Sequence, residues 1–264
     1  MLIDVHGHIG RSADAAGELA LLGAYMDAAR VGKLLVSNHA ATRAAGDVEE
    51  IPANLATLTA HRADPRLVPL YRVRLGRFDS HVSAFAGALS LERFAGALFA
   101  PALDDYACDD ARLDAYFGVL AKLRRPAFML VQGSGAARPG RAHTLARRAP
   151  DVPLVMVSAA RGPHWTEAIE VLERTALQGG ANTWLCTSHA SVAEVRHAVE
   201  RVGSSRLLLG SDAVAGGQAH VVRQVSFLDD LRTAIRDEHW EAITGANAEQ
   251  MLAGAAAPTA SNAR

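Results

Sequence analysis

Short hydrophobic segments alternate with longer amphipathic segments along most of this chain. Eight short segments are nearly continuous in hydrophobic residues, which is typical of strands covered on both faces; they span residues 1–5, 33–37, 67–73, 94–100, 127–131, 154–158, 182–186 and 206–210. Segments with the helical spacing of hydrophobic residues follow them, at residues 13–30, 52–63, 80–93, 110–124, 139–149, 165–177, 192–202, 220–236 and 239–254. Strands that alternate with helices in this way form parallel sheets.

Eight strand–helix units within 264 residues predict an α/β fold, namely a (β/α)8 TIM barrel that forms a single domain over residues 1–254. An open doubly wound sheet is the alternative. Such a sheet usually carries a glycine-rich phosphate loop after its first strand, and Gly7-His8-Ile9-Gly10 is not one. Pro52 is expected in the first turn of its helix. Residues 255–264 are small and polar and are predicted to be disordered.

Composition narrows the class of protein. The formal net charge of −1, with both signs mixed along the chain, argues against a nucleic-acid surface. Two cysteines cannot form a disulfide framework, and they fit a reducing cytoplasm. No secretory signal pattern opens the chain, and the longest apolar candidate for a membrane span, residues 84–103, is interrupted by Glu92 and Arg93. We therefore expect a cytoplasmic protein without membrane or nucleic-acid partners.

The motif Asp4-Val5-His6-Gly7-His8 lies at the end of the first predicted strand. Alternate residues of a strand point to the same face, so Asp4, His6 and His8 are expected to project together. Two imidazoles on one face can bind the same zinc ion or another first-row metal ion. An isolated His-x-His pair more often faces water, so the metal interpretation depends on partners elsewhere in the chain.

The segment Gly210-Ser211-Asp212 closes the eighth predicted strand. The first and eighth strands of a barrel are neighbours, and functional groups collect at the C-terminal ends of the strands. Asp212 is therefore expected beside His6 and His8. A carboxylate there can bind the metal or accept a proton from an activated water. The competing interpretation of Asp212 is an aspartate that caps a helix or stabilises a turn.

Several segments together resemble the amidohydrolase superfamily, and in particular its amidohydrolase-related (amidohydrolase 2) family. They are residues 3–10, 151–158, 182–188, 208–213 and 243–248. The resemblance implies a distorted (β/α)8 barrel with one or two divalent metals at the strand ends. It further implies hydrolysis of amides, lactones and related bonds, or non-oxidative decarboxylation. His6 and His8 match the first-strand ligands, and Asp212 matches the eighth-strand ligand or proton-transfer group. We expect one divalent ion, zinc first and manganese as the alternative.

The sequence departs from the family pattern at other strand ends. The resemblance implies a histidine after the fifth strand and another after the sixth, where this chain has Gln132 and Ser158. The fourth strand holds Leu98 and Phe99 instead of an acid or a modified lysine. Three ligands can still hold a metal with an open position. An amide oxygen or a hydroxyl is a poorer zinc ligand than imidazole, so we predict a degenerate metal site.

Further polar residues at predicted strand ends are candidates for binding the substrate. A histidine there can act as a ligand, a proton shuttle or a substrate contact, and an arginine can clamp a carboxylate with two hydrogen bonds. Solvent-facing histidines and surface salt bridges remain the alternative. The candidates are His39, Arg72, Gln132, Ser158, His164 and His189.

Two functions remain open at this level. The first is a metal-dependent hydrolase that acts on a small amide, lactone or carboxylated substrate through a metal-activated water, with a decarboxylase as its close variant. The second is a catalytically impaired barrel that serves as a structural or regulatory subunit beside an intact paralogue. The loops between strands and helices are short, so we expect an open site or one covered by another barrel subunit in a homo- or hetero-oligomer.

Overall fold

The computed structural model describes residues 1–42, 47–75, 79–91, 94–132, 135–213 and 217–254. Within these residues, eight parallel strands pair in chain order, from β1 to β8. They are β1 Leu2–Ile9, β2 Val31–Asn38, β3 Leu67–Val73, β4 Gly96–Phe99, β5 Ala127–Leu130, β6 Leu154–Val157, β7 Thr183–Cys186 and β8 Leu207–Leu208. The tail predicted to be disordered lies outside the described residues.

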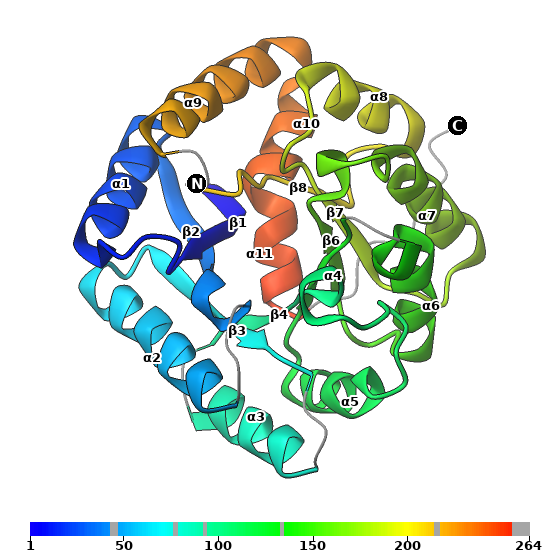
Figure 1. Ribbon diagram of the computed structural model, residues 1–264. Helices are drawn as coiled ribbons and strands as arrows, with labels where there is room; N and C mark the ends of the chain where they lie inside the picture. The colour runs from blue at the N-terminus through cyan, green and yellow to red at the C-terminus, as the bar shows by residue number, and fades with distance from the viewer. Residues whose placement is uncertain (43–46, 76–78, 92–93, 133–134, 214–216, 255–264) are drawn as a thin grey trace.

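The ring closes where the segment after β8 meets β1. The backbone N–H of Val5 donates to the carbonyl of Leu209 at 2.9 Å, and that of His8 donates to the carbonyl of Ala213 at 2.8 Å. Gly7 and Ala213 form a parallel bridge. Figure 1 shows the ring of strands with helices around it. The predicted (β/α)8 TIM barrel in a single domain is therefore confirmed.

Most helices of the described residues surround the barrel, and no described helix is long and apolar enough to cross a lipid bilayer. They are α1 Ala15–Ala28, α2 Asp47–Ala63, α3 Asp79–Leu91, α4 Pro101–Asp104, α5 Leu113–Leu123, α6 Pro139–Arg148, α7 Trp165–Gln178, α8 Val192–Val202, α9 Gly217–Ala234, α10 Asp237–Glu241 and α11 Asn247–Leu252. Pro52 lies inside α2 and not in its first turn, because the helix begins five residues earlier than predicted.

Hydrophobic side chains form two layers, one inside the barrel and one between strands and helices. The inner layer includes Ile3, Val5, Phe128 and Trp184, all fully buried. Burying a side chain of this size contributes about 1.5–3 kcal/mol. Helix α11 crosses the middle of the ring in Figure 1 and adds Met251 to this layer. The inner packing thus supports the strand ends from below.

One irregularity in β1 changes the direction of its side chains. The register with β2 runs from Asp4 opposite Leu34 to Gly7 opposite Val36, so β1 has one extra residue there. Such a bulge redirects side chains. Asp4 points outward to Tyr25 of α1, whereas His6 and His8 meet each other. The prediction that all three share a face is therefore wrong for Asp4.

Candidate metal centre and substrate cavity

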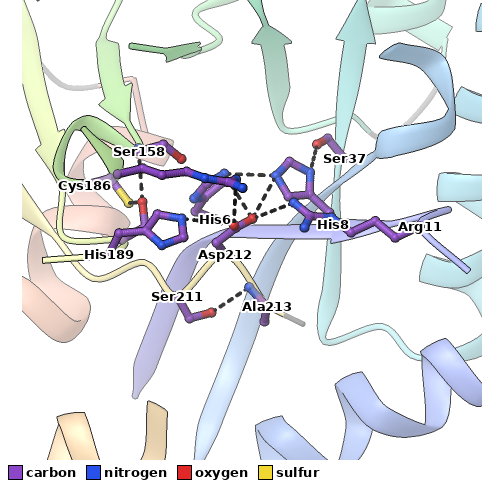
Figure 2. A network of polar contacts seen from close by, with 12 residues as sticks. His6, His8, Arg11, Ser37, Ser158, Cys186, His189, Ser211, Asp212 and Ala213 are labelled. Atoms are coloured by element: carbon purple, nitrogen blue, oxygen red, sulfur yellow. Dashed lines mark hydrogen bonds and ion pairs between the residues drawn. The ribbon is translucent and has the colours of Figure 1, made fainter. Parts of the chain in front are cut away.

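The side chains of His6, His8 and Asp212 converge at the C-terminal end of the barrel. Their possible ligand atoms all lie within 4.8 Å of one another. The two Nε2 atoms are 3.1 Å apart, and Asp212 Oδ1 lies 3.3 Å from Nε2 of His8 and 4.0 Å from that of His6. Figure 2 shows Asp212 between the two imidazoles and His189. Closure of the barrel therefore brings residues from both ends of the chain to one point.

The protonation and spacing of the two imidazoles fit a shared cation. Burial lowers the pKa of His6 to about 4 and that of His8 well below its ordinary value. Both rings are therefore neutral at pH 7 and each offers a lone pair. Two nitrogens that bind one ion at about 2.0–2.1 Å stand roughly 3 Å apart, as these do. His8 Nδ1 contacts Ser37 Oγ at 2.9 Å, which orients its Nε2 toward the centre.

Asp212 is buried and held by three positively charged or hydrogen-bonding neighbours. Its Oδ2 contacts His189 Nε2 at 3.0 Å, and its Oδ1 accepts a hydrogen bond from Arg11 at 2.9 Å. Arg161 lies 3.9 Å from Oδ2. Burial raises the pKa of Asp212, but the hydrogen bond with His189 and the nearby charges outweigh it and hold the pKa well below its usual range. An ionised Asp212 suits a metal ligand better than a general base.

The backbone at this end of the barrel is strained at three successive strand ends. Ser158, His189 and Asp212 follow β6, β7 and β8, and their φ angles are 60°, 68° and 58°. This left-handed region costs an ordinary residue about 1–2 kcal/mol. Strain of this kind gathers at functional sites because the surrounding structure must hold it in place.

Asp4 supports the site from behind instead of facing it. Its carboxylate accepts hydrogen bonds from the backbone N–H groups of His6 at 3.0 Å and Ser211 at 3.2 Å. It also accepts the hydroxyl hydrogens of Tyr25, at 2.7 Å, and of Ser211. Burial raises the pKa of Asp4 to about 6, so the group is still ionised at pH 7. Asp4 thereby ties α1, β1 and the segment before Asp212 together.

A cavity of about 450 Å³ opens beside the centre. Its described lining is mixed, with polar and apolar side chains: His8, Arg11, His39, Ala102, Leu103, Leu130, Gln132, Ser158, Arg161 and Asp212. The structure thus places three of the predicted substrate-binding residues, His39, Gln132 and Ser158, on the cavity wall. His189 reaches the same centre through Asp212.

The other two candidates lie elsewhere. Arg72 is fully buried, and its guanidinium donates to Asp104 Oδ2 of α4 at 2.7 Å. His164 precedes α7, and its Nδ1 lies 3.8 Å from Glu167 Oε2. Neither belongs to the described cavity lining. The predicted carboxylate clamp at Arg72 is thus occupied by a carboxylate of the protein itself.

Sequence reasoning missed the two arginines that line the cavity, Arg11 and Arg161. Arg11 follows the last residue of β1 by two positions, and Arg161 ends the 3₁₀ turn after β6. Residues just past strand ends form the functional face of a barrel. Their place in the chain was therefore a usable signal.

Comparisons with known proteins agree with the fold. The family model described as Amidohydrolase matches residues 3–253, whereas no curated protein matches the sequence. The chain is similar in structure to a TIM-barrel protein from Bordetella bronchiseptica, with a TM-score of 0.74, 16% identity and coverage of 96% of this chain and 98% of that one.

Two similar structures contain manganese. One is a dihydroxybenzoic acid decarboxylase from Polaromonas sp. JS666, with a TM-score of 0.70, 14% identity and 96% coverage of both chains. The other is a 5-carboxyvanillate decarboxylase from Novosphingobium aromaticivorans, with a TM-score of 0.68, 13% identity and 96% coverage of both chains. At these identities the structural similarity shows the fold alone. The match of the family model over nearly the whole length shows that the chain belongs to the amidohydrolase family.

Proposed function

We propose that this chain is a metal-dependent enzyme that hydrolyses or decarboxylates a small substrate, with one divalent ion held by His6, His8 and Asp212. The observation that carries the proposal is the convergence of these three ligand groups beside a cavity at the C-terminal end of the barrel. Two neutral imidazoles and one carboxylate suit zinc and also manganese. The manganese in two similar decarboxylases supports the latter.

The roles of the residues follow from their surroundings. A bound ion would polarise a carbonyl or carboxyl group and lower the pKa of a water. His8, oriented by Ser37, and His6 supply lone pairs. His189 can hold or pass a proton, because it contacts Asp212 and its side chain is 24% exposed. Gln132, Ser158 and His39 can then hydrogen-bond to the substrate from the cavity wall.

Metal content of the purified chain tests the proposal. After incubation with zinc or manganese and removal of free ions, elemental analysis should find about one ion per chain. A His6→Ala/His8→Ala variant should lose it, whereas His197→Ala, which removes an exposed imidazole from α8, should retain it. Equal metal content in all three proteins would contradict the assignment.

Product analysis would then separate the two reactions. Aromatic hydroxy acids test for release of carbon dioxide, and lactones and amides test for hydrolysis. Activity should appear on one of these classes, and it should disappear when the metal is removed by a chelator. Activity that is unaffected by the chelator would contradict metal dependence.

A second candidate function is a barrel that serves as a structural or regulatory subunit. Gln132 and Ser158 favour it, because both line the cavity at strand ends where the family resemblance implies histidine. A chain that takes up no metal and elutes as a complex with a second barrel subunit would support this candidate. A chain that binds metal and is active by itself would exclude it.

A further inference from the structure

Two guanidinium groups stand beside a single carboxylate at the edge of the cavity. Arg11 donates to Oδ1 of Asp212 at 2.9 Å, and Arg161 lies 3.9 Å from its Oδ2. Asp212 is the only acidic residue in the described lining. Two guanidinium groups thus face one carboxylate in this part of the lining.

The arginines retain hydrogen-bonding capacity. A guanidinium has five N–H donors. Among the described residues, the guanidinium of Arg11 donates only to Asp212, and its Nε is buried with no partner. Arg161 approaches Asp212 at a distance longer than a hydrogen bond. Its side chain is 55% exposed, so it can turn toward a ligand without breaking a buried contact.

The segment that carries Arg11 is held in place. The backbone N–H groups of Gly10 and Arg11 donate to the carboxylate of Glu18 in α1, at 2.6 and 3.0 Å. Arg161 belongs to the turn that begins after Ser158. Each arginine is thus anchored beside a different strand end, β1 for one and β6 for the other, and both reach the same cavity.

We propose that Arg11 and Arg161 bind the carboxylate of a small organic acid, which is the substrate class of this cavity. The inference rests on the proposed function and names what that function acts on. Guanidinium groups match the planar carboxylate with paired hydrogen bonds. Ala102, Leu103 and Leu130 supply apolar surface in the same lining for the rest of the molecule. The volume of about 450 Å³ suits a molecule built around one ring.

Calorimetric titration of the metal-free protein with benzoate and with benzamide tests the proposal. These probes have similar shape, but only benzoate carries a charge. We expect benzoate to bind the unmodified protein at least about tenfold more tightly than benzamide does. Arg11→Gln and Arg161→Gln should each weaken benzoate binding about tenfold or more, because hydrogen bonds to charged groups are lost. Arg196→Gln, which removes an exposed arginine of α8, should leave it unchanged.

Several results would overturn the inference. Equal affinities for benzoate and benzamide would do so, and so would benzoate affinity that neither glutamine variant reduces. Inorganic phosphate that binds as tightly as benzoate would show a general anion site instead. If Arg11→Gln fails to fold, Arg161→Gln decides the matter, since that side chain is largely exposed.

Metal uptake, measured on the same samples, keeps the two proposals separate. Loss of benzoate binding with retained metal uptake in the arginine variants would support the arginine site. A chain that binds benzoate through the arginines but takes up no metal would refute the proposed enzyme function alone. A chain that takes up metal but binds no benzoate would refute the arginine site alone.

Discussion

Acid should destabilise this protein through the buried imidazole of His6. Burial lowers the pKa of His6 from 6.5 to about 4. Between about pH 6.5 and pH 4, His6 is therefore protonated in the unfolded chain but neutral in the folded chain. The unfolding free energy decreases as the pH falls through this range. For these two pKa values the loss at pH 5 is about 2 kcal/mol relative to pH 7.5.

Urea unfolding of the metal-free protein at pH 7.5 and pH 5, followed by tryptophan fluorescence, measures this loss. Trp184 is fully buried inside the barrel and reports on its opening. Asp4 has the opposite effect, because burial raises its pKa to about 6. The buried, ionised carboxylate costs stability at pH 7.5, and this cost decreases as Asp4 is protonated at lower pH. The comparison must therefore be made between proteins that share Asp4.

The His6→Asn variant provides this comparison. Between pH 7.5 and pH 5, the unfolding free energy of this variant should fall by about 2 kcal/mol less than that of the unmodified protein. His197→Asn, at an exposed position of α8, should behave as the unmodified protein does. A difference between His6→Asn and the unmodified protein below about 0.5 kcal/mol would refute the reasoning, since it would mean that His6 titrates alike in both states.

Three further changes probe the support of the site. Asp4→Ala should lower the unfolding free energy by about 3 kcal/mol or more in urea unfolding, because four donors lose their buried acceptor; a loss below 1 kcal/mol would contradict this role. Ser37→Ala should weaken metal affinity about 10–100-fold in chelator competition, with little change in stability, because His8 loses the partner that orients it. Gly210→Ala should destabilise by about 1–3 kcal/mol, because the added Cβ would overlap Cys186 Sγ. Adding Cys186→Ala should recover part of that loss in thermal unfolding, and no recovery would argue against the overlap.

Most helices and strands were predicted because their hydrophobic pattern and their terminating residues lie within the segment itself. Helix α8 spans Val192–Val202 as predicted; Ser191 before it forms a capping box with Glu194 in its first turn, and Gly203 follows it. Strand β3 also agrees residue for residue, at Leu67–Val73. Hydrophobic runs bounded by turn residues are sufficient for such elements.

The elements that were predicted wrongly or not at all are either very short or depend on contacts with distant parts of the chain. Helix α4 has only four residues, Pro101–Asp104, too few to show a periodic pattern. The single helix predicted over residues 239–254 is interrupted by a π turn at Ala242–Ala246. The carbonyl of Ile243 in that turn accepts the N–H of Leu209, so the break is linked to the end of the barrel wall. No pattern within the segment signals such a contact.

The centre of the candidate site was predictable from the sequence, and its edge was predictable only in part. The relation between His6, His8 and Asp212 follows from the neighbourhood of the first and eighth strands in any closed barrel. The environment of Arg72 depends on a pairing with Asp104, 32 positions away, that composition cannot reveal. Arg11 lies just past a strand end, which could have marked it as a candidate, but only the folded loop places it against Asp212.

The extra residue in β1 links closure of the barrel to assembly of the site. A regular strand would direct Asp4 and His6 to the same face, whereas the bulge lets His6 face the centre and Asp4 bind Ser211 from behind. Ser211 directly precedes Asp212, and the N–H of His8 bonds to Ala213 directly after it. The contacts that close the ring therefore also set the spacing of the three ligand groups, so a change that loosens this seam should separate the ligands before it unfolds the barrel.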